Sequence, residues 1–199
     1  MLTLKSHQLK AALNCAATKD VRYYINGIAL QCIGEQVYII ATDDHVLFAG
    51  KPETVWTGEV QRGPWTIIID SATVKAACKT GTNDVTLAAL PDGKYSLGAT
   101  IFAPVDGRFP DWQKIVPSKT DGAIAQFNPR LLVNCAKALG DWQQSKKPAL
   151  PYVAHNGNSA AIVTTSDETA FCVVMPCCIE RGASPFEVSP IAKAFAEAA

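Results

Sequence analysis

The residues Thr42-Asp43-Asp44-His45 form the densest group of side chains that could perform chemistry. Carboxylates and imidazoles bind hard metal ions and carry protons in general acid–base catalysis. A metallohydrolase needs further ligands, but His7 lies at an expected helix start and His155 in an expected hairpin turn. We therefore expect no metal site, no catalytic residue and no enzymatic activity.

The seven cysteines include no Cys-x-x-Cys pair; they are Cys15, Cys32, Cys78, Cys135, Cys172, Cys177 and Cys178. Each lies in an apolar run, which favours reduced thiols that pack as small core residues. The chain also has no Gly-x-Gly-x-x-Gly motif and no phosphate loop, so we expect no cofactor.

Composition narrows the protein class further. The 199 residues include 18 basic and 18 acidic side chains, and 48% are hydrophobic, enough for one large domain or two small ones. No apolar run approaches the roughly 18 residues of a membrane span. The N-terminal segment is amphipathic and dotted with lysine, unlike a signal peptide. These features predict a cytoplasmic protein without a membrane partner.

The chain repeats one pattern three times: a β-prone run, a helix start, an apolar helix and several strands. The β-prone runs are Leu2–Leu4, Trp65–Ile69 and Ala123–Phe127, and the helices are expected over 7–19, 72–81 and 130–140. Ser6, Asp70 with Ser71, and Asn128 are good N-caps, and Pro129 suits a first helical position. Gly81 and Gly140 are expected as C-caps.

The strands that follow each helix are rich in aromatic and β-branched residues. They are expected at Tyr23–Cys32, Gln36–Ala41, Val85–Leu90, Tyr95–Ala103, Tyr152–Ala154, Ala160–Thr164 and Ala170–Pro176. Turns are expected at Gly34-Glu35, Pro91–Lys94 and Asn156-Gly157. The period of about 60 residues indicates an α+β fold of repeated β-α-β-β-β units, with helices on one face and antiparallel sheets on the other.

The three expected helices and their ends are basic and contain no acidic residue. Their cations are Lys5, Lys10, Lys19, Lys75, Lys79, Arg130 and Lys137. One interpretation is a face that contacts DNA phosphates without reading bases. The other is a solvated helix surface that excludes acids by chance, and the sequence alone does not separate the two.

Four strings resemble the bacterial β sliding clamp family, the DNA polymerase III β subunit, which is the processivity factor of DNA replication. DVRYYINGIALQC (20–32) and ATDDHVLFAG (41–50) are similar to its middle domain. VDGRFPDWQKIVP (105–117) resembles the exit from that domain, and FCVVMP (171–176) its C-terminal strand. The resemblance implies a fold whose helices line a hole around duplex DNA while its sheets lie outside.

The resemblance also implies a domain organisation. Residues 1–117 are expected to form one clamp-like domain of two units, 1–62 and 63–117, and residues 118–180 a half domain. We expect the third unit to complete a domain with a second chain, giving a homo-oligomer, a ring-like tetramer, in which four copies of three units match a normal ring. An open sheet edge favours such pairing.

Clamps bind short peptides of polymerases and repair proteins in an apolar pocket. The resemblance implies that the corresponding pocket of this chain is formed by Ile25, Thr42, His45, Leu47, Pro110, Lys114, Ile115, Val173, Val174, Met175 and Pro176. Methionine and branched aliphatics suit a groove for apolar anchors. Taken singly, Val173 and Val174 are equally explained as core residues. The sequence departs from the family at Asp44, where glycine is usual, and at Val46, where arginine is usual.

After the FCVVMP strand, residues 181–199 form an extension, with a helix expected from Ser189-Pro190 onward. It either caps the peptide pocket or an exposed unit, or it docks on its own sheet.

The sequence thus predicts a non-catalytic clamp-like processivity factor or scaffold. Its partners would be duplex DNA, a polymerase or other clamp-binding protein, and a clamp loader. The alternative is a peptide-binding adaptor that does not encircle DNA and competes with the host clamp.

Overall fold

The computed structural model describes residues 1–57, 64–79 and 83–177, and within them it confirms the α+β class. The first run of elements is β1 (Leu2–Lys5), α1 (Ser6–Ala12), β2 (Gly27–Ile33), β3 (Gln36–Thr42) and β4 (Val46–Gly50). The second is β6 (Trp65–Asp70), α2 (Ser71–Ala77), β7 (Asp84–Ala89), β8 (Tyr95–Leu97) and β9 (Thr100–Phe102). The third is α3 (Pro129–Gln143), β10 (Tyr152–Ala154), β11 (Ala161–Thr164) and β12 (Ala170–Val174).

Shorter elements connect these runs: the two-residue strand β5 (Val55–Trp56) and four 3-10 turns. The turns are η1 (Leu13–Cys15), η2 (Tyr23–Ile25), η3 (Pro91–Gly93) and η4 (Trp112–Ile115). None of the helices in the described ranges is long and apolar enough to cross a membrane. The domain boundaries at 117 and 180 stay a prediction, and the extension 181–199 lies outside the described residues.

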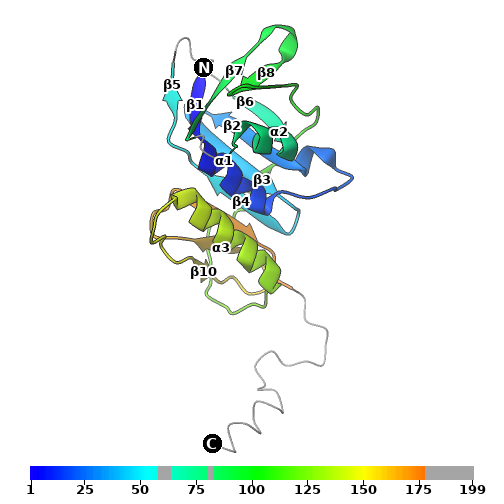
Figure 1. Cartoon of the computed structure of the whole chain (residues 1–199). Coiled ribbons are helices and arrows are strands. Elements are labelled where there is room, and N and C mark those ends of the chain that lie inside the picture. Colours follow the sequence, from blue (N-terminus) through cyan, green and yellow to red (C-terminus); the bar gives the residue numbers. More distant parts are fainter. Residues whose placement is uncertain (58–63, 80–82, 178–199) are drawn as a thin grey trace, which may run out of the picture.

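The first two runs exchange their leading strands. β1 pairs with β7, so Leu2 lies opposite Leu87, and β6 pairs with β2, so Ile69 lies opposite Ile28. The resulting sheets have the orders β5-β1-β7-β8-β9 and β10-β11-β12-β4-β3-β2-β6 (Figure 1). Each run therefore needs the other to complete its sheet.

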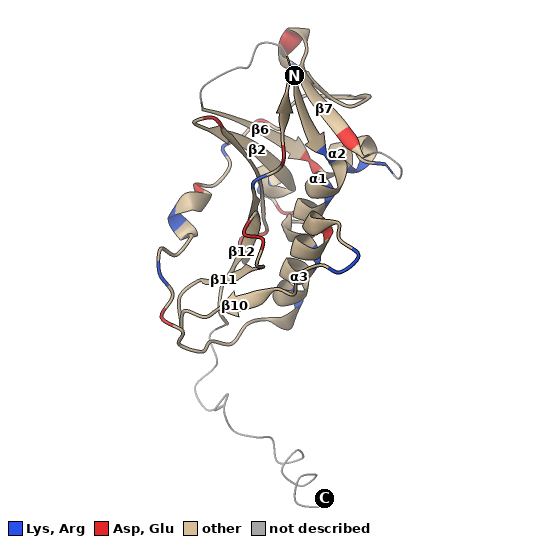
Figure 2. Ribbon diagram, turned by 90° about the vertical axis from the view of Figure 1, so that its left-hand side faces the viewer, with Lys and Arg blue, Asp and Glu red and all other residues tan. Residues whose placement is uncertain are grey.

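The third run joins the first through the antiparallel pair β12 and β4, which places Val173 opposite Leu47. Its helix α3 packs beside α1, and α1 in turn contacts α2. All three helices cover one face of the seven-stranded sheet, as Figure 2 shows for the lower part of the molecule. The strands and helices of residues 129–174 are thus built onto the first run.

The central strands β2, β3 and β4 of the seven-stranded sheet are buried on both faces. Ile28, Leu30, Ile39, Phe48 and Ile69 point to the main core beneath the helices, whereas their neighbours Ala29, Ile40, Leu47 and Ile68 point to a second, outer cluster. Successive side chains of a strand alternate between faces, so a strand covered on both sides reads as a continuous apolar run. Segment 103–117 covers the outer face with Phe109 and Trp112.

Two helix starts follow the sequence prediction and one does not. Asp70 accepts hydrogen bonds from the backbone of Ala72 and Thr73, and Asn128 accepts one from Arg130, with Pro129 at the first helical position. The prediction for Ser6 is wrong, because Lys5 occupies the N-cap position and Ser6 is already helical. Strand β1 runs directly into α1 and leaves no capping residue between them.

The predicted helix ends need correction. α1 stops at Ala12 and continues as 3-10 turn η1, so Lys19 lies beyond the helix, with a left-handed φ of 59°. α3 continues through Gly140 to Gln143 and ends at Gln144, whose φ is 47°. Gly140 is therefore no C-cap, and Asp141 lies within α3, so the helices are not free of acids. Gly81 lies outside the described residues.

Among the strands, residues 123–127 form no strand, and Tyr23–Ile25 forms η2 instead. The segment 123–127 has no sheet of a following run to join; it hydrogen bonds to the β10–β11 turn through Gly157 N and Ala123 O (2.7 Å). The predicted strand 95–103 splits at Gly98 (φ 57°) into β8 and β9, and strand β4 was not predicted.

Candidate peptide-binding site and helical face

The predicted peptide-binding residues come from segments far apart in sequence, and strand pairing brings two of these together. Leu47 of β4 lies opposite Val173 of β12, and the backbone N–H of Met175 donates to His45 O (3.0 Å). The end of the TDDHVL turn, residues 45–47, therefore lies beside residues 173–175 of the FCVVMP strand.

The Thr42-Asp43-Asp44-His45 run is a tight turn. Thr42 Oγ1 donates to Val46 O (2.8 Å), and Asp43 Oδ1 accepts the backbone N–H groups of His45 and Val46. Asp44 has a φ of 81°, a conformation that favours glycine, and its carboxylate pairs with Arg22 (3.0 Å). Within 1–57, 64–79 and 83–177 no group of three or more His, Cys, Asp or Glu residues could hold a metal ion.

Ile25, Leu47 and Val173 form the buried floor of this region. All three belong to the outer cluster and are almost inaccessible to solvent. Trp112 closes the cluster: its ring packs against Tyr38 and Phe171, and its Nε1 donates to Gln31 Oε1 (2.7 Å). The role of Trp112 as a cover was not predicted from the sequence. The continuous apolar runs of β2, β3 and β4 could have indicated it, because they imply that both faces of these strands are covered.

The accessible residues surround this floor. Met175 is 44% exposed and Ile115 is 47% exposed, and His45, Pro110 and Lys114 are also exposed. Lys114 pairs with Asp111 (2.8 Å) on η4. Thr42 is buried, Pro176 is partly buried, and Val174 lies on the opposite face, in the main core. The floor and the exposed Met175 and Ile115 are apolar, and two ion pairs, Arg22–Asp44 and Lys114–Asp111, belong to the same segments.

The predicted DNA-facing residues divide into helical and flanking ones. Lys10, Lys75, Arg130 and Lys137 lie on α1, α2 and α3 and are exposed. Lys5 ends β1 and pairs with Asp84 (2.8 Å), whereas Lys19 and Lys79 follow helices. Asp141 on α3 accepts a hydrogen bond from Asn14 (3.1 Å), so the acid within the helical layer has a local partner.

Five of the cysteines behave as core residues, as predicted: Cys15, Cys32, Cys78, Cys135 and Cys172 are buried. The thiols of Cys15, Cys135 and Cys172 hydrogen bond with one another between η1, α3 and β12. Burial and these hydrogen bonds raise the pKa of Cys172, so that this thiol stays protonated. Cys177 is exposed, which corrects the prediction for that residue.

Comparison with known proteins gives relatives for this arrangement. The β sliding clamp of Escherichia coli (strain K12) is 29% identical over 115 residues, which cover 53% of this chain and 29% of the relative. The solved structure of the Pseudomonas aeruginosa DNA polymerase sliding clamp matches with a TM-score of 0.64 and 16% identity, over 89% of this chain and 65% of that one. The H. pylori β clamp in complex with diflunisal matches with a TM-score of 0.69 and 11% identity, over 89% and 66%. No family model matches the chain.

This chain has the fold of the β sliding clamps, and about half of its sequence is similar to part of one of them. The chain covers less than one third of the curated relative and about two thirds of the solved clamps. Two features described above belong to this fold: the first two runs exchange their leading strands, and the helices lie together on one face of a sheet.

Proposed function

We propose that this chain acts as a clamp-like processivity factor or scaffold that lies on duplex DNA and binds peptides of polymerase or repair proteins. The observation that carries the proposal is the β4–β12 pairing, which places the TDDHVL turn beside the FCVVMP strand. Both segments resemble the parts of clamps that form the peptide pocket. Its setting would be the cytoplasm.

The helical layer supports the DNA-facing part of the proposal. α1 and α2 contain no acidic residue, and the acid of α3 is hydrogen bonded to Asn14. Exposed Lys10, Lys75, Arg130 and Lys137 can contact phosphates without reading bases, so binding would be independent of sequence and would weaken steeply with salt.

The surface around Met175 and Ile115 supports the peptide-binding part. A flexible methionine and a branched aliphatic residue stand exposed beside a rigid floor of Leu47 and Val173. Apolar anchors of a partner peptide would bury these side chains, and Lys114 would meet a carboxylate of the peptide.

The edge of the seven-stranded sheet supports assembly. Among the described strands, β10 is one of those with a neighbour on one side only; its first residue, Tyr152, is 54% exposed, and Leu150, just before it, is 88% exposed. In the first two runs, the strand after each helix receives the leading strand of the other run. We infer that β10 receives the corresponding segment of a second copy, and that four copies close a ring, which would need a clamp loader to open on DNA.

Two measurements test this function. Light scattering should give a mass of about four times 21.3 kDa, and the protein should stay on nicked circular DNA but slide off once that DNA is linearised. A Tyr152→Asp variant should lower the mass, whereas Val133→Asp, at a similarly exposed position of helix α3, serves as the matched control. If the protein is a monomer that binds clamp-type peptides and is retained no better on nicked circular DNA than on linear DNA, the ring is wrong and the adaptor function is supported instead.

A further inference from the structure

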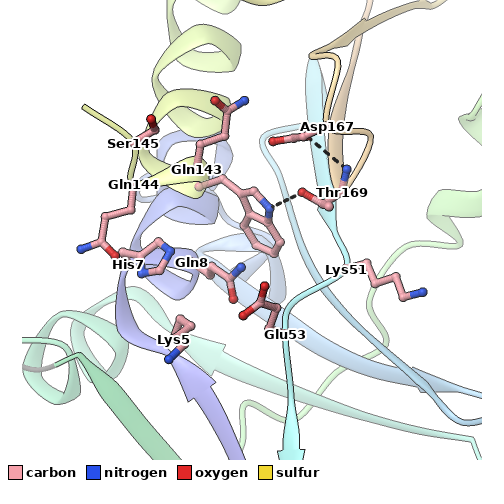
Figure 3. Close-up of a pocket in the computed structure, with 11 residues that line it drawn as sticks. Lys5, His7, Gln8, Lys51, Glu53, Gln143, Gln144, Ser145, Asp167 and Thr169 are labelled. Carbon is pink, nitrogen blue, oxygen red and sulfur yellow. Dashed lines mark hydrogen bonds between the residues drawn. The ribbon is translucent and has the colours of Figure 1, made fainter. Parts of the chain in front are cut away.

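A polar pocket of about 510 Å³ is lined by none of the predicted peptide-binding residues. It is lined by the first turn of α1, residues 51–53 after β4, the last turn of α3 and the β11–β12 connection at 167–169 (Figure 3). Neither the resemblance nor the comparisons assign a role to it. Its composition differs from that of the peptide-binding surface, since it combines three glutamines with two acidic side chains, two lysines and a histidine.

Gln8 gives the pocket an unsatisfied acceptor. The residue is only 7% exposed, and its side-chain oxygen Oε1 has no hydrogen-bond partner among the described residues. Figure 3 shows this side chain pointing into the pocket toward Glu53. A buried carbonyl oxygen without a donor is unfavourable, so a rotation of the Gln8 side chain that brings this oxygen to a donor group in the pocket would lower the free energy.

The charges around Gln8 favour a positively charged donor. Glu53 and Asp167 form no ion pair with any residue that the structure describes. Lys5 is already paired with Asp84, and burial lowers the pKa of His7, which keeps its ring neutral at pH 7. The amine of Lys51 points away from the pocket in Figure 3.

Trp142 supplies the wall of the pocket. Its Nε1 donates to Thr169 Oγ1 (3.0 Å), and its ring packs against Phe48, so the indole is held rigidly. Trp142 lines the pocket together with Gln8 and Thr169. Aromatic rings attract cations, and the planar guanidinium group also stacks on them.

We propose that this pocket binds the guanidinium group of an arginine side chain presented by a partner protein. The N–H groups of the guanidinium donate to the Glu53 carboxylate and to Gln8 Oε1, next to the Trp142 ring. A guanidinium fits better than an ammonium group because its planar fork can serve two acceptors at once. The proposal does not depend on ring formation or on the peptide-binding surface.

The test follows the Trp142 indole N–H signal in ¹H–¹⁵N spectra during titration with acetyl-arginine-amide. Acetyl-citrulline-amide has nearly the same shape without the charge and should bind at least tenfold more weakly. Glu53→Gln should weaken the binding of acetyl-arginine-amide at least tenfold. Glu35→Gln, an exposed acid in the β2–β3 turn, should leave it unchanged.

Gln8→Leu adds a second readout. It should weaken binding and yet melt at the same or a higher temperature, because it removes the unsatisfied oxygen. Absence of a saturable shift, equal binding of the citrulline compound, or unchanged binding by Glu53→Gln would each overturn the proposal. Because Glu53 is exposed, its variant decides the question even if Gln8→Leu does not fold.

Discussion

The ring of Trp142 lies directly on the backbone of Gly50. A Cβ atom built on Gly50 would lie 2.5 Å from ring carbon Cη2 and 2.7 Å from Cζ3. Trp142 is in the last turn of α3, and Gly50 ends β4 opposite Ala170 of β12. This contact is one of those that join the third run of elements to the first. Gly50 has no positive φ, so glycine is required here because a larger side chain has no space, not because of the backbone conformation.

Gly50→Ala should destabilise the protein by about 1–3 kcal/mol, since the new methyl group overlaps a rigid indole. Urea denaturation followed by circular dichroism measures the change. A smaller residue in place of Trp142 should recover part of the loss, so the double variant Gly50→Ala with Trp142→Leu should show coupling between the sites. A loss below about 0.5 kcal/mol in the single variant would contradict the close packing.

Gly140→Ala should act in the opposite direction. Gly140 lies inside α3, and a Cβ there meets no atom within 4 Å. Alanine is favoured over glycine in a helix interior, so the free energy of unfolding should rise by about 0.5–1 kcal/mol. A destabilised variant would indicate that α3 ends at Gly140 in solution, as the sequence alone suggests.

The N-cap of α2 should make stability depend on pH. Burial acts to raise the pKa of Asp70, but hydrogen bonds from Thr73 and Ala72 outweigh it and lower that pKa below its usual value. A carboxyl with a lowered folded pKa stabilises above its unfolded pKa of about 3.9 and loses this effect as pH falls through the folded pKa. Asp70→Ala should cost about 1 kcal/mol at pH 7 and less at pH 2.

Asp70→Asn is the control for this prediction, because it retains a capping oxygen without the charge. Its loss should be smaller at pH 7, and its stability should vary less between pH 5 and pH 2 than that of the parent chain. An equal pH dependence of the two proteins would contradict the role of the Asp70 carboxylate.

Substitutions on the peptide-binding surface should separate binding from folding. Met175→Asp and Ile115→Asp place a carboxylate at exposed positions. Each should weaken the binding of a clamp-binding peptide, measured by fluorescence anisotropy, at least tenfold, which is a loss of about 1.4 kcal/mol or more in binding free energy. Their melting temperatures should change little. Ile101→Asp on β9, which is 65% exposed, is the matched control and should bind normally. Equal binding by all three would argue against this surface.

Neutralising the helical cations should reduce the salt dependence of DNA binding. For each phosphate that a variant no longer neutralises, the slope of log K against log salt should become shallower by about 0.9. Arg130→Gln and Lys137→Gln on α3 should each show this change in filter binding. Lys94→Gln, in the exposed β7–β8 turn, should not. An unchanged slope in both α3 variants would place the DNA elsewhere.

The sequence determined those features that depend on neighbouring residues. Asp70 and Asn128 cap their helices because a short acceptor side chain reaches the nearby N–H groups whatever lies beyond. The turn at Gly34 and the hairpin at Asn156-Gly157 follow from backbone preferences in the same way. The clamp-like strings of residues indicated the fold correctly, and with it the order of strands and helices.

The tertiary structure decided what depends on distant partners. Residues 123–127 are as apolar as a strand but form none; the segment hydrogen bonds instead to the β10–β11 turn, where Gly157 N donates to Ala123 O (2.7 Å). α3 runs through Gly140, since Trp142 gains a place against Gly50 that no local rule predicts. The pairing of β4 with β12 joins segments more than a hundred residues apart in the sequence. The unsatisfied oxygen of Gln8 likewise depends on the fold, because the pocket that Gln8 lines is formed by segments distant from it in the sequence.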